Sequence, residues 1–319
     1  MSTSILNRPM RRRNMYLILV LILLLEVGLF AWSFFSKTNP VKTVTQYLPL
    51  GSTVPTFQAN IYGPLSDPFS KPMAVAVVDR TIYIADTNNQ RIQVFDYDGN
   101  PISMFGENGE GEGQFRFPYG IASDAQGQLY IADLYNGNIS IFSADGQFIK
   151  YFGQKGEFVR PAGLSIDGDK LYVSDVAKNE IIVFALDGTK LLSFGKKGTG
   201  DGELNSPNAL VHVGNKIYVS DTGNDRIEVF DEQGNFLLKA SSQLANPRGI
   251  SVDPQGNIYV VSNLTNKVVV FKSNGEKLTT IGQIGSDDGQ LRFPNGLTRD
   301  NQGRLYITDV GNGRTVIFQ

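Results

Sequence analysis

From residue 53 to its end, the chain alternates short apolar runs with polar turns that are rich in glycine. One pattern, Tyr followed by Ile or Val, any residue and Asp, recurs at nearly even intervals, with Ser replacing Asp once. The six copies begin at Tyr83, Tyr130, Tyr172, Tyr218, Tyr259 and Tyr306, which are 47, 42, 46, 41 and 47 residues apart. Short runs of β-branched and aromatic residues favour strands, and this period is typical of propellers with one four-stranded sheet per repeat. The pattern therefore predicts an all-β, six-bladed β-propeller.

Each repeat predicts four strands. The first strand follows a proline, as in Pro118-Tyr119-Gly120, and the tyrosine pattern is the second strand. The third strand ends in Phe, and a tight turn such as Asp145-Gly146 leads to the fourth. Glycine suits these turns because it readily adopts positive φ.

The last repeat stops after its third strand, residues 315–318. We expect the missing strand at the other end of the repeat region, where residues 56–62 (TFQANIY) end like a fourth strand. Pairing of these two segments would complete blade 6, close the ring and cover two open sheet edges.

The amino-terminal part predicts a membrane anchor. Residues 1–14 form a basic tail with four arginines, and residues 15–36 are apolar apart from Glu26 and a few polar residues at the end. About 20 apolar residues in a helix span the hydrocarbon core of a bilayer. Because the arginines lie only before this segment, we expect the tail in the cytoplasm and the body of the chain outside it. Residues 37–52 are typical of a linker.

A cleaved signal peptide is the alternative, because Ala31-Trp32-Ser33 offers small residues at a cleavage spacing. This alternative also places residues 53–319 outside the cytoplasm. Glu26 has two interpretations: it pairs with a partner helix, or it is protonated or faces a hydrated defect.

The propeller region is acidic. Of the 29 basic and 31 acidic residues of the chain, six and one precede residue 53, which leaves 23 and 30 and a net charge of −7 in residues 53–319. Binding to nucleic acid depends on positive charge, so we expect no nucleic acid as a partner. The chain has no cysteine, which excludes disulfide and thiolate chemistry.

The repeats resemble NHL repeats, whose pattern is Pro-x-Gly-Ile, Tyr-Val-x-Asp, Asn-x-Arg-Ile-x-Val-Phe, Asp-Gly and Phe-Gly. Residues 86–95 (DTNNQRIQVF) and 221–230 (DTGNDRIEVF) match this pattern most closely, and the likeness covers residues 53–319. The resemblance implies a six-bladed propeller of NHL type. It implies no single function, because propellers host many unrelated activities.

The charged residues that recur from blade to blade are expected to be structural. A carboxylate at the end of the second strand can accept backbone N–H groups of the following loop, and an arginine can bridge to it. The aspartates are Asp86, Asp133, Asp175, Asp221 and Asp309, and the arginines are Arg91, Arg226 and Arg314. Asn138, Glu180 and Lys267 take the arginine position in the other blades, so the arginines form no sixfold ligand ring.

Function is expected where the blades differ, on the face where loops leave the second strands and lead into the first. Residues just after the first-strand proline should lie at the central axis, with arginines and a tyrosine on the rim nearby. Arg and Tyr are favoured at binding hot spots. The candidate ligand-binding residues are Tyr119, Asn208, Arg248, Asn295, Arg116, Arg160, Arg292 and Tyr135. The alternative is a solvated rim whose basic charges are partly offset by acidic residues of the same loops.

Catalytic sites of similar propellers fit the chain poorly. Lyases of this type hold zinc with histidines, whereas the chain has only His212, which we expect to be packed within a first strand. Lactonase-type propellers hold calcium with axial Glu, Asn and Asp; Asn208 and Asn295 offer oxygens, but no carboxylate falls at a matching position. We therefore predict no catalytic residue, no metal ligand and no cofactor, with weak Ca²⁺ binding by the loops GENGEGEG and GSDDG as the one alternative.

The sequence favours a non-catalytic, extracytoplasmic binding or scaffold module that is tethered to the membrane and engages a protein or an extended ligand through one rim. The short basic tail, single anchor and single exported domain favour a bacterial surface protein. A metal-dependent lyase or lactonase-like enzyme is the alternative, and an RNA-binding NHL protein is disfavoured by the charge.

Overall fold

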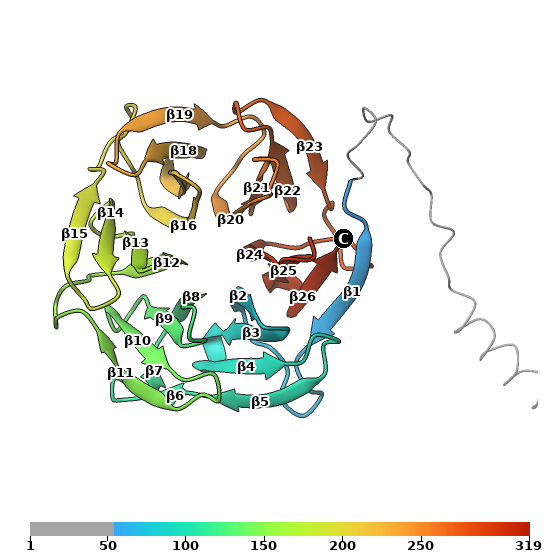
Figure 1. The fold of residues 1–319 in the computed structure, drawn as a ribbon. Helices are drawn as coiled ribbons and strands as arrows, with labels where there is room; N and C mark the ends of the chain where they lie inside the picture. Colours follow the sequence, from blue (N-terminus) through green and yellow to red (C-terminus); the bar gives the residue numbers. More distant parts are fainter. Residues whose placement is uncertain (1–53) are drawn as a thin grey trace, which may run out of the picture. The chain divides into compact units, whose positions relative to one another are not determined.

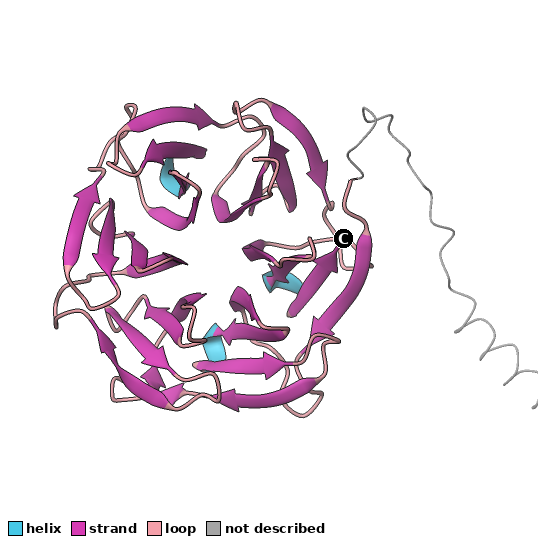
Figure 2. Cartoon of the chain, viewed as in Figure 1, coloured by secondary structure: helices cyan, strands magenta, loops and turns pink. Residues whose placement is uncertain are grey.

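The computed structural model describes residues 54–319. Within this part, the chain forms six antiparallel sheets of four strands that surround a central axis (Figures 1 and 2). The all-β, six-bladed propeller predicted from the repeats is confirmed. The predicted tail, membrane anchor and linker (residues 1–14, 15–36 and 37–52) lie outside the described residues. Residues 54–319 contain no helix that is long and apolar enough to cross a membrane.

Five blades are built from consecutive strands. Blade 1 contains β2 (Pro72–Val78), β3 (Thr81–Asp86), β4 (Arg91–Phe95) and β5 (Pro101–Phe105). Blade 2 contains β8 (Pro118–Ser123), β9 (Leu129–Asp133), β10 (Asn138–Phe142) and β11 (Phe148–Phe152). Blade 3 contains β12 (Pro161–Asp167), β13 (Lys170–Asp175), β14 (Glu180–Ala185) and β15 (Lys190–Phe194). Blade 4 contains β16 (Pro207–Val213), β17 (Lys216–Asp221), β18 (Arg226–Asp231) and β19 (Phe236–Ala240). Blade 5 contains β20 (Pro247–Val252), β21 (Ile258–Ser262), β22 (Lys267–Phe271) and β23 (Lys277–Ile281).

Blade 6 joins the two ends of the propeller. Its strands are β24 (Pro294–Arg299), β25 (Leu305–Asp309), β26 (Arg314–Phe318) and β1 (Phe57–Tyr62). The strand expected at residues 56–62 is thus β1, which pairs antiparallel with β26 and lies beside it in Figure 1. Thr56 and Gln319 exchange backbone hydrogen bonds of 2.8 and 2.9 Å. The ring therefore closes between segments that are far apart in sequence.

Short elements complete the structure. Glu107–Asn108 (β6) and Gln114–Phe115 (β7) form a small parallel pair in the loop that leads into blade 2. Three 3₁₀ turns follow second strands, at Thr87–Asn89, Thr222–Asn224 and Val310–Asn312.

Burial along the strands explains their composition. All five residues of β9 are buried, since this strand packs against neighbouring blades on both faces. In β11, at the outside of the ring, the three central residues are exposed. A strand covered on both faces is a continuous apolar run, whereas an outer strand carries polar residues. The third-strand phenylalanines are buried between blades: Phe142, for example, packs against Phe105, Phe115 and Phe148.

Glycine in the Pro-x-Gly step is required where the blades meet near the axis. A Cβ atom added to Gly120 would lie 1.9 Å from the carbonyl oxygen of Ala162 in blade 3. We expect Gly120→Ala to lower the free energy of unfolding by about 1–3 kcal/mol, because the two backbones must move apart. Urea denaturation measures this change. Gly111→Ala is the control, with an effect within about 0.5 kcal/mol, since its closest neighbour is the side chain of Gln114 in an exposed loop. Equal losses in the two variants would contradict this explanation.

Candidate functional site

The recurring aspartates join the two sets of loops that form one face of the propeller, called here the upper face. In blade 2, Asp133 Oδ1 accepts the backbone N–H groups of Phe117, Tyr135 and Asn136 at 3.0, 3.0 and 2.9 Å. Its Oδ2 accepts the N–H of Arg116 at 2.6 Å. One carboxylate thus holds both the leading loop, which precedes the first strand, and the exit loop, which follows the second. The structural role predicted for the aspartates is confirmed.

The recurring arginines complete these links in three blades. The Nε atoms of Arg91, Arg226 and Arg314 each donate to Oδ2 of the aspartate in the same blade at 2.8 Å. In blade 5, where Ser262 replaces the aspartate, Ser262 Oγ accepts the N–H of Ala245 at 2.9 Å instead. The loops of the upper face are therefore fixed by side chains that every repeat provides.

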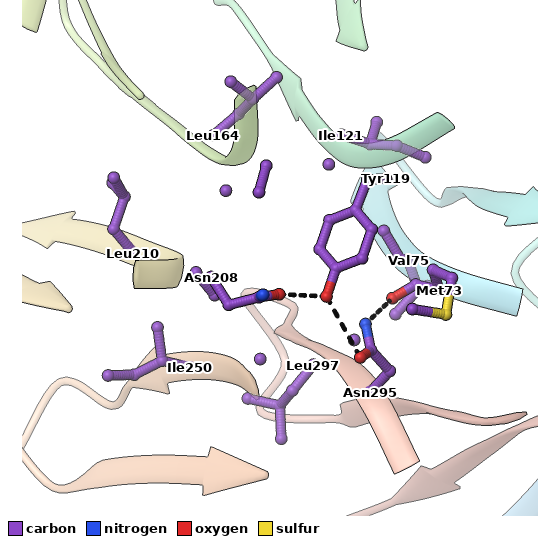
Figure 3. Close-up of a pocket in the computed structure, with 17 residues that line it drawn as sticks. Met73, Val75, Tyr119, Ile121, Leu164, Asn208, Leu210, Ile250, Asn295 and Leu297 are labelled. Carbon is purple, nitrogen blue, oxygen red and sulfur yellow. Dashed lines mark hydrogen bonds between the residues drawn. The ribbon is translucent and has the colours of Figure 1, made fainter. Parts of the chain in front are cut away.

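At the axis, four of the predicted site residues form one hydrogen-bonded network. The Tyr119 side chain crosses the channel and its hydroxyl donates to Asn208 Oδ1 (Figure 3). The same hydroxyl lies 3.3 Å from Asn295 Oδ1, and Arg248 Nη1 donates to it at 3.2 Å. Asn295 Nδ2 donates to the carbonyl of Met73 at 2.7 Å. Side chains of blades 2, 4, 5 and 6 and a backbone carbonyl of blade 1 thus form one network.

This network separates the upper face from the interior of the channel. Tyr119, Asn208 and Asn295 are buried, and next to them six apolar side chains, one from each blade, surround a space of about 80 Å³ (Figure 3). These side chains belong to Val75, Ile121, Leu164, Leu210, Ile250 and Leu297. The amide oxygens of Asn208 and Asn295, the only calcium ligands that sequence offered at the axis, are both within reach of the Tyr119 hydroxyl. The axial residues therefore act as a plug.

The other four predicted residues lie on the rim of the upper face and are exposed. The backbone N–H groups of Arg116, Arg160 and Arg292 donate to the aspartates of blades 2, 3 and 6, while their side chains face solvent. The side chain of Tyr135 is 54% exposed, although one face of its ring packs on Phe117 at 4.6 Å between centroids. These residues do not contact the axial plug as a group; they surround it.

The rim has apolar members that sequence patterns did not single out. Val159 and Phe293 precede or follow the rim arginines directly and are 51% and 46% exposed. Lys71, in the corresponding position of blade 1, lies over the ring of Phe117 at 5.6 Å. Phe293 adopts a φ of 49°, which is uncommon for a bulky residue. The sequence contained a signal for them, because Lys71 and Phe293 directly precede a first-strand proline and Val159 lies two residues before one.

The lone histidine is packed as expected, away from the plug. His212 in β16 is buried, stacks on Tyr172 at 4.5 Å between ring centroids, and its Nδ1 lies 2.8 Å from Asp167 Oδ2. Burial, together with the charges of Glu232, Asp167 and Asp169, raises the pKa of Tyr172 to about 12. Across residues 54–319, no group of three His, Cys, Asp or Glu side chains is placed to hold a metal ion.

Similarity to known proteins agrees with this architecture. A family described as a 6-bladed beta-propeller matches residues 118–196, and the NHL repeat matches residues 69–95 and 291–318. The protein brain tumor of Drosophila melanogaster is 40% identical over 62 residues, which are 19% of this chain and 6% of that protein. The match thus spans a small fraction of that relative.

Solved structures show the same fold. A streptogramin B lyase structure superimposes with a TM-score of 0.61 at 14% identity, over 82% of this chain and 96% of that one. A gluconolactonase of Xanthomonas campestris gives 0.61 at 20% identity, over 85% and 98%. Identities this low show the fold alone. Residues 54–319 are therefore a six-bladed β-propeller that contains NHL repeats.

Proposed function

We propose that the propeller is a non-catalytic binding module that engages a protein or an extended ligand through the rim of its upper face. Residues 15–36 tether it to the membrane, with the amino terminus in the cytoplasm and the propeller outside, on the surface of a bacterium. The observation that carries the proposal is the rim itself. Arginines with exposed side chains alternate there with exposed aromatic and aliphatic residues, on loops whose backbones are fixed by buried aspartates.

The composition of this rim supports binding of a partner. Arginine and tyrosine contribute strongly to binding energy when a partner removes them from water, and loops that are already ordered lose little entropy on association. The inner positions carry Lys71, Arg116, Arg160, Arg248 and Arg292. Acidic residues lie farther out in the same loops: Glu110, for example, pairs with Arg116 at 3.0 Å between its Oε1 and Nη1. A partner with acidic side chains fits the inner positions best.

The plug supports binding on the rim over chemistry in the channel. A ligand that approaches from the upper face meets Tyr119, Asn208 and Asn295 already bonded to one another. Access to the interior of the channel from this face would require the network to open. The rim residues need no such rearrangement.

Crosslinked co-purification from intact membranes tests the proposal. We expect the wild-type protein to capture a partner that the triple variant Arg116→Ser, Arg160→Ser, Arg292→Ser loses. The control replaces Lys150, Lys190 and Lys277 with serine. These three lysines are exposed on outer strands, so the control has the same change in charge.

Retention of the partner by the rim variant, or its loss from both triple variants, would refute specific binding at the rim. Circular dichroism must show that both variants are folded. Failure of the wild-type protein to capture any partner would also count against the proposal, and a metal-dependent activity would then be the function to assay.

A further inference from the structure

Four of the six blades place a cation against carbonyl oxygens of the leading loop, and a fifth carries a lysine at the same sequence position. Arg91, Arg226 and Arg314 hold this position in blades 1, 4 and 6, and Lys267 holds it in blade 5. In blade 3, Glu180 takes the position, but the ammonium of Lys178 donates to the leading-loop carbonyl of Glu157 at 2.7 Å. Blade 2 differs, because it has Asn138 at this position and Asn136 where blade 3 has the lysine.

The guanidinium groups satisfy carbonyl oxygens of the leading loop. Arg226 Nη2 donates to the carbonyls of Gly200 and Glu203, each at 2.7 Å. In blade 6, Arg314 Nη2 donates in the same way to Asp287 and Gln290, at 2.9 and 2.8 Å. The carbonyls of Gly200 and Asp287 also accept a backbone N–H of the loop, so the arginine adds a second donor there. At the carbonyls of Glu203 and Gln290 it takes the place of water.

Blade 2 has the same loop without the arginine. Gln114 Oε1 accepts the N–H of Gly111, as Glu203 Oε2 accepts that of Gly200. Gly111 and Gln114 are therefore the counterparts of Gly200 and Glu203, whose carbonyls accept from Arg226 in blade 4. Asn138 pairs with Asp133 in the strand register as Arg226 pairs with Asp221. Its side chain therefore starts from the same place but ends well short of the loop.

A pocket lies beside Asn138, where blade 2 lacks the guanidinium group. It has a volume of about 630 Å³, within the range of ligand sites, and is lined by residues that include Asn136, Asn138, Tyr135 and Tyr151. In blade 1, the corresponding space holds the guanidinium of Arg91, whose Nη1 lies 3.3 Å from Sδ of Met104, the register counterpart of Tyr151. The pocket therefore lies beside the position that a side-chain cation takes in blade 1.

Two residues that line this pocket each carry a buried oxygen atom without a donor. Asn136 Oδ1 and Asn138 Oδ1 are buried and have no hydrogen-bond partner among residues 54–319. A buried acceptor without a partner is costly, so a ligand that donates to both oxygens gains affinity. The rings of Tyr135 and Tyr151 flank the same space, and aromatic faces attract cations.

The surrounding charges also permit a cation. Arg116 lines the pocket but is paired with Glu110, and Lys155 lies at its edge. Burial and the negative charges of Glu112 and Asp133 raise the pKa of Tyr151, so both carboxylates act on a side chain that lines the pocket.

We propose that the blade 2 pocket binds the guanidinium group of an arginine side chain that the partner supplies. This inference rests on the proposed rim function, since Arg116 and Tyr135 belong to both surfaces. The partner's arginine would take the position that the chain's own arginines occupy in blades 1, 4 and 6. The acidic side chains of the partner would meet the inner arginines of the rim beside it.

The test is titration of the full-length protein, purified in detergent, with N-acetyl-arginine amide and with the citrulline analogue. Citrulline has nearly the same shape as arginine but no charge. We expect the arginine probe to bind with a dissociation constant on the order of 1 mM, as befits a ligand of this size, and at least ten times more tightly than the citrulline probe. Equal affinities would overturn the proposal.

Asn138→Arg is the decisive variant, because it supplies the missing guanidinium from the chain itself. We expect this variant to melt at a higher temperature than the wild type and to lose arginine binding by at least tenfold. Unchanged binding to a folded Asn138→Arg protein would overturn the proposal. If the variant does not fold, the double variant Tyr135→Ala, Tyr151→Ala serves instead, and it must weaken binding of the arginine probe.

These outcomes are separate from those of the membrane crosslinking. Loss of partner capture in the rim triple variant, combined with no binding of the arginine probe, would leave the rim function standing and reject the arginine site. Capture that is abolished by Asn138→Arg, whose rim arginines are intact, would support the arginine site directly.

Discussion

Replacement of Arg226 by alanine is expected to lower the free energy of unfolding by about 3–5 kcal/mol, one of the largest losses for a single change in this propeller. The guanidinium lies between two buried carboxylates, 2.8 Å from Asp221 Oδ2 and 3.0 Å from Glu228 Oε1. It also donates to the carbonyls of Thr199, Gly200 and Glu203. Its removal leaves the charge of buried Asp221 without its arginine and three carbonyl oxygens without this donor.

Thermal and urea denaturation measure this effect, with a decrease in Tm of roughly 10 °C. Arg116→Ala is the matched control, because this arginine pairs with an exposed Glu110 and such pairs contribute about 0–1 kcal/mol. Arg226→Lys should lie between the two, since it keeps the charge but loses the planar fork of donors. A loss below about 1 kcal/mol for Arg226→Ala would show that the carboxylates find other partners.

Glu228→Gln is expected to change how stability depends on pH. Burial raises the pKa of Glu228 to about 7, against the attraction of Arg226. A carboxyl whose pKa is higher in the folded state than its ordinary value of 4.5 favours folding when it is protonated. Its contribution is therefore complete below about pH 4.5 and is lost as the pH rises through 7. Glutamine resembles the protonated form at every pH.

The difference in unfolding free energy between Glu228→Gln and the wild type should therefore increase by about 2–3 kcal/mol from pH 5 to pH 8. Urea denaturation at a series of pH values measures it. Glu203→Gln is the control: the N–H of Gly200 and then Lys196 lower the pKa of Glu203, so no such increase is expected above pH 5. A flat difference for Glu228→Gln would mean that Arg226 keeps the carboxylate charged throughout.

The fold could be predicted from the sequence because each repeat carries its own local signals. The tyrosine pattern marks a strand buried on both faces, and the glycine turns mark the hairpins. Even the strand that closes the ring could be predicted, since residues 56–62 end as other fourth strands do. Repetition allowed these weak signals to reinforce one another.

The site could be predicted only in part. The residues after the first-strand prolines indeed lie at the axis, but their hydrogen bonds depend on which side chain is long enough to cross it. Tyr119 reaches Asn208 and Asn295 on other blades, and this contact joins the axial residues into a plug. No local pattern relates residues that are separated by more than 80 positions.

The sequence by itself determined that the chain repeats six times, where each strand begins, and that the recurring aspartates hold loops, because these properties depend on neighbours within one repeat. Only the tertiary structure decided which loops share a pocket and which polar atoms remain buried without a partner. Asn138 looks like a minor variation in the sequence; in the folded ring it lines a pocket, whereas blades 1, 3, 4 and 6 place a cation at the leading loop. The physical reason is that the size of a pocket depends on all the side chains packed around it, which come from different parts of the chain.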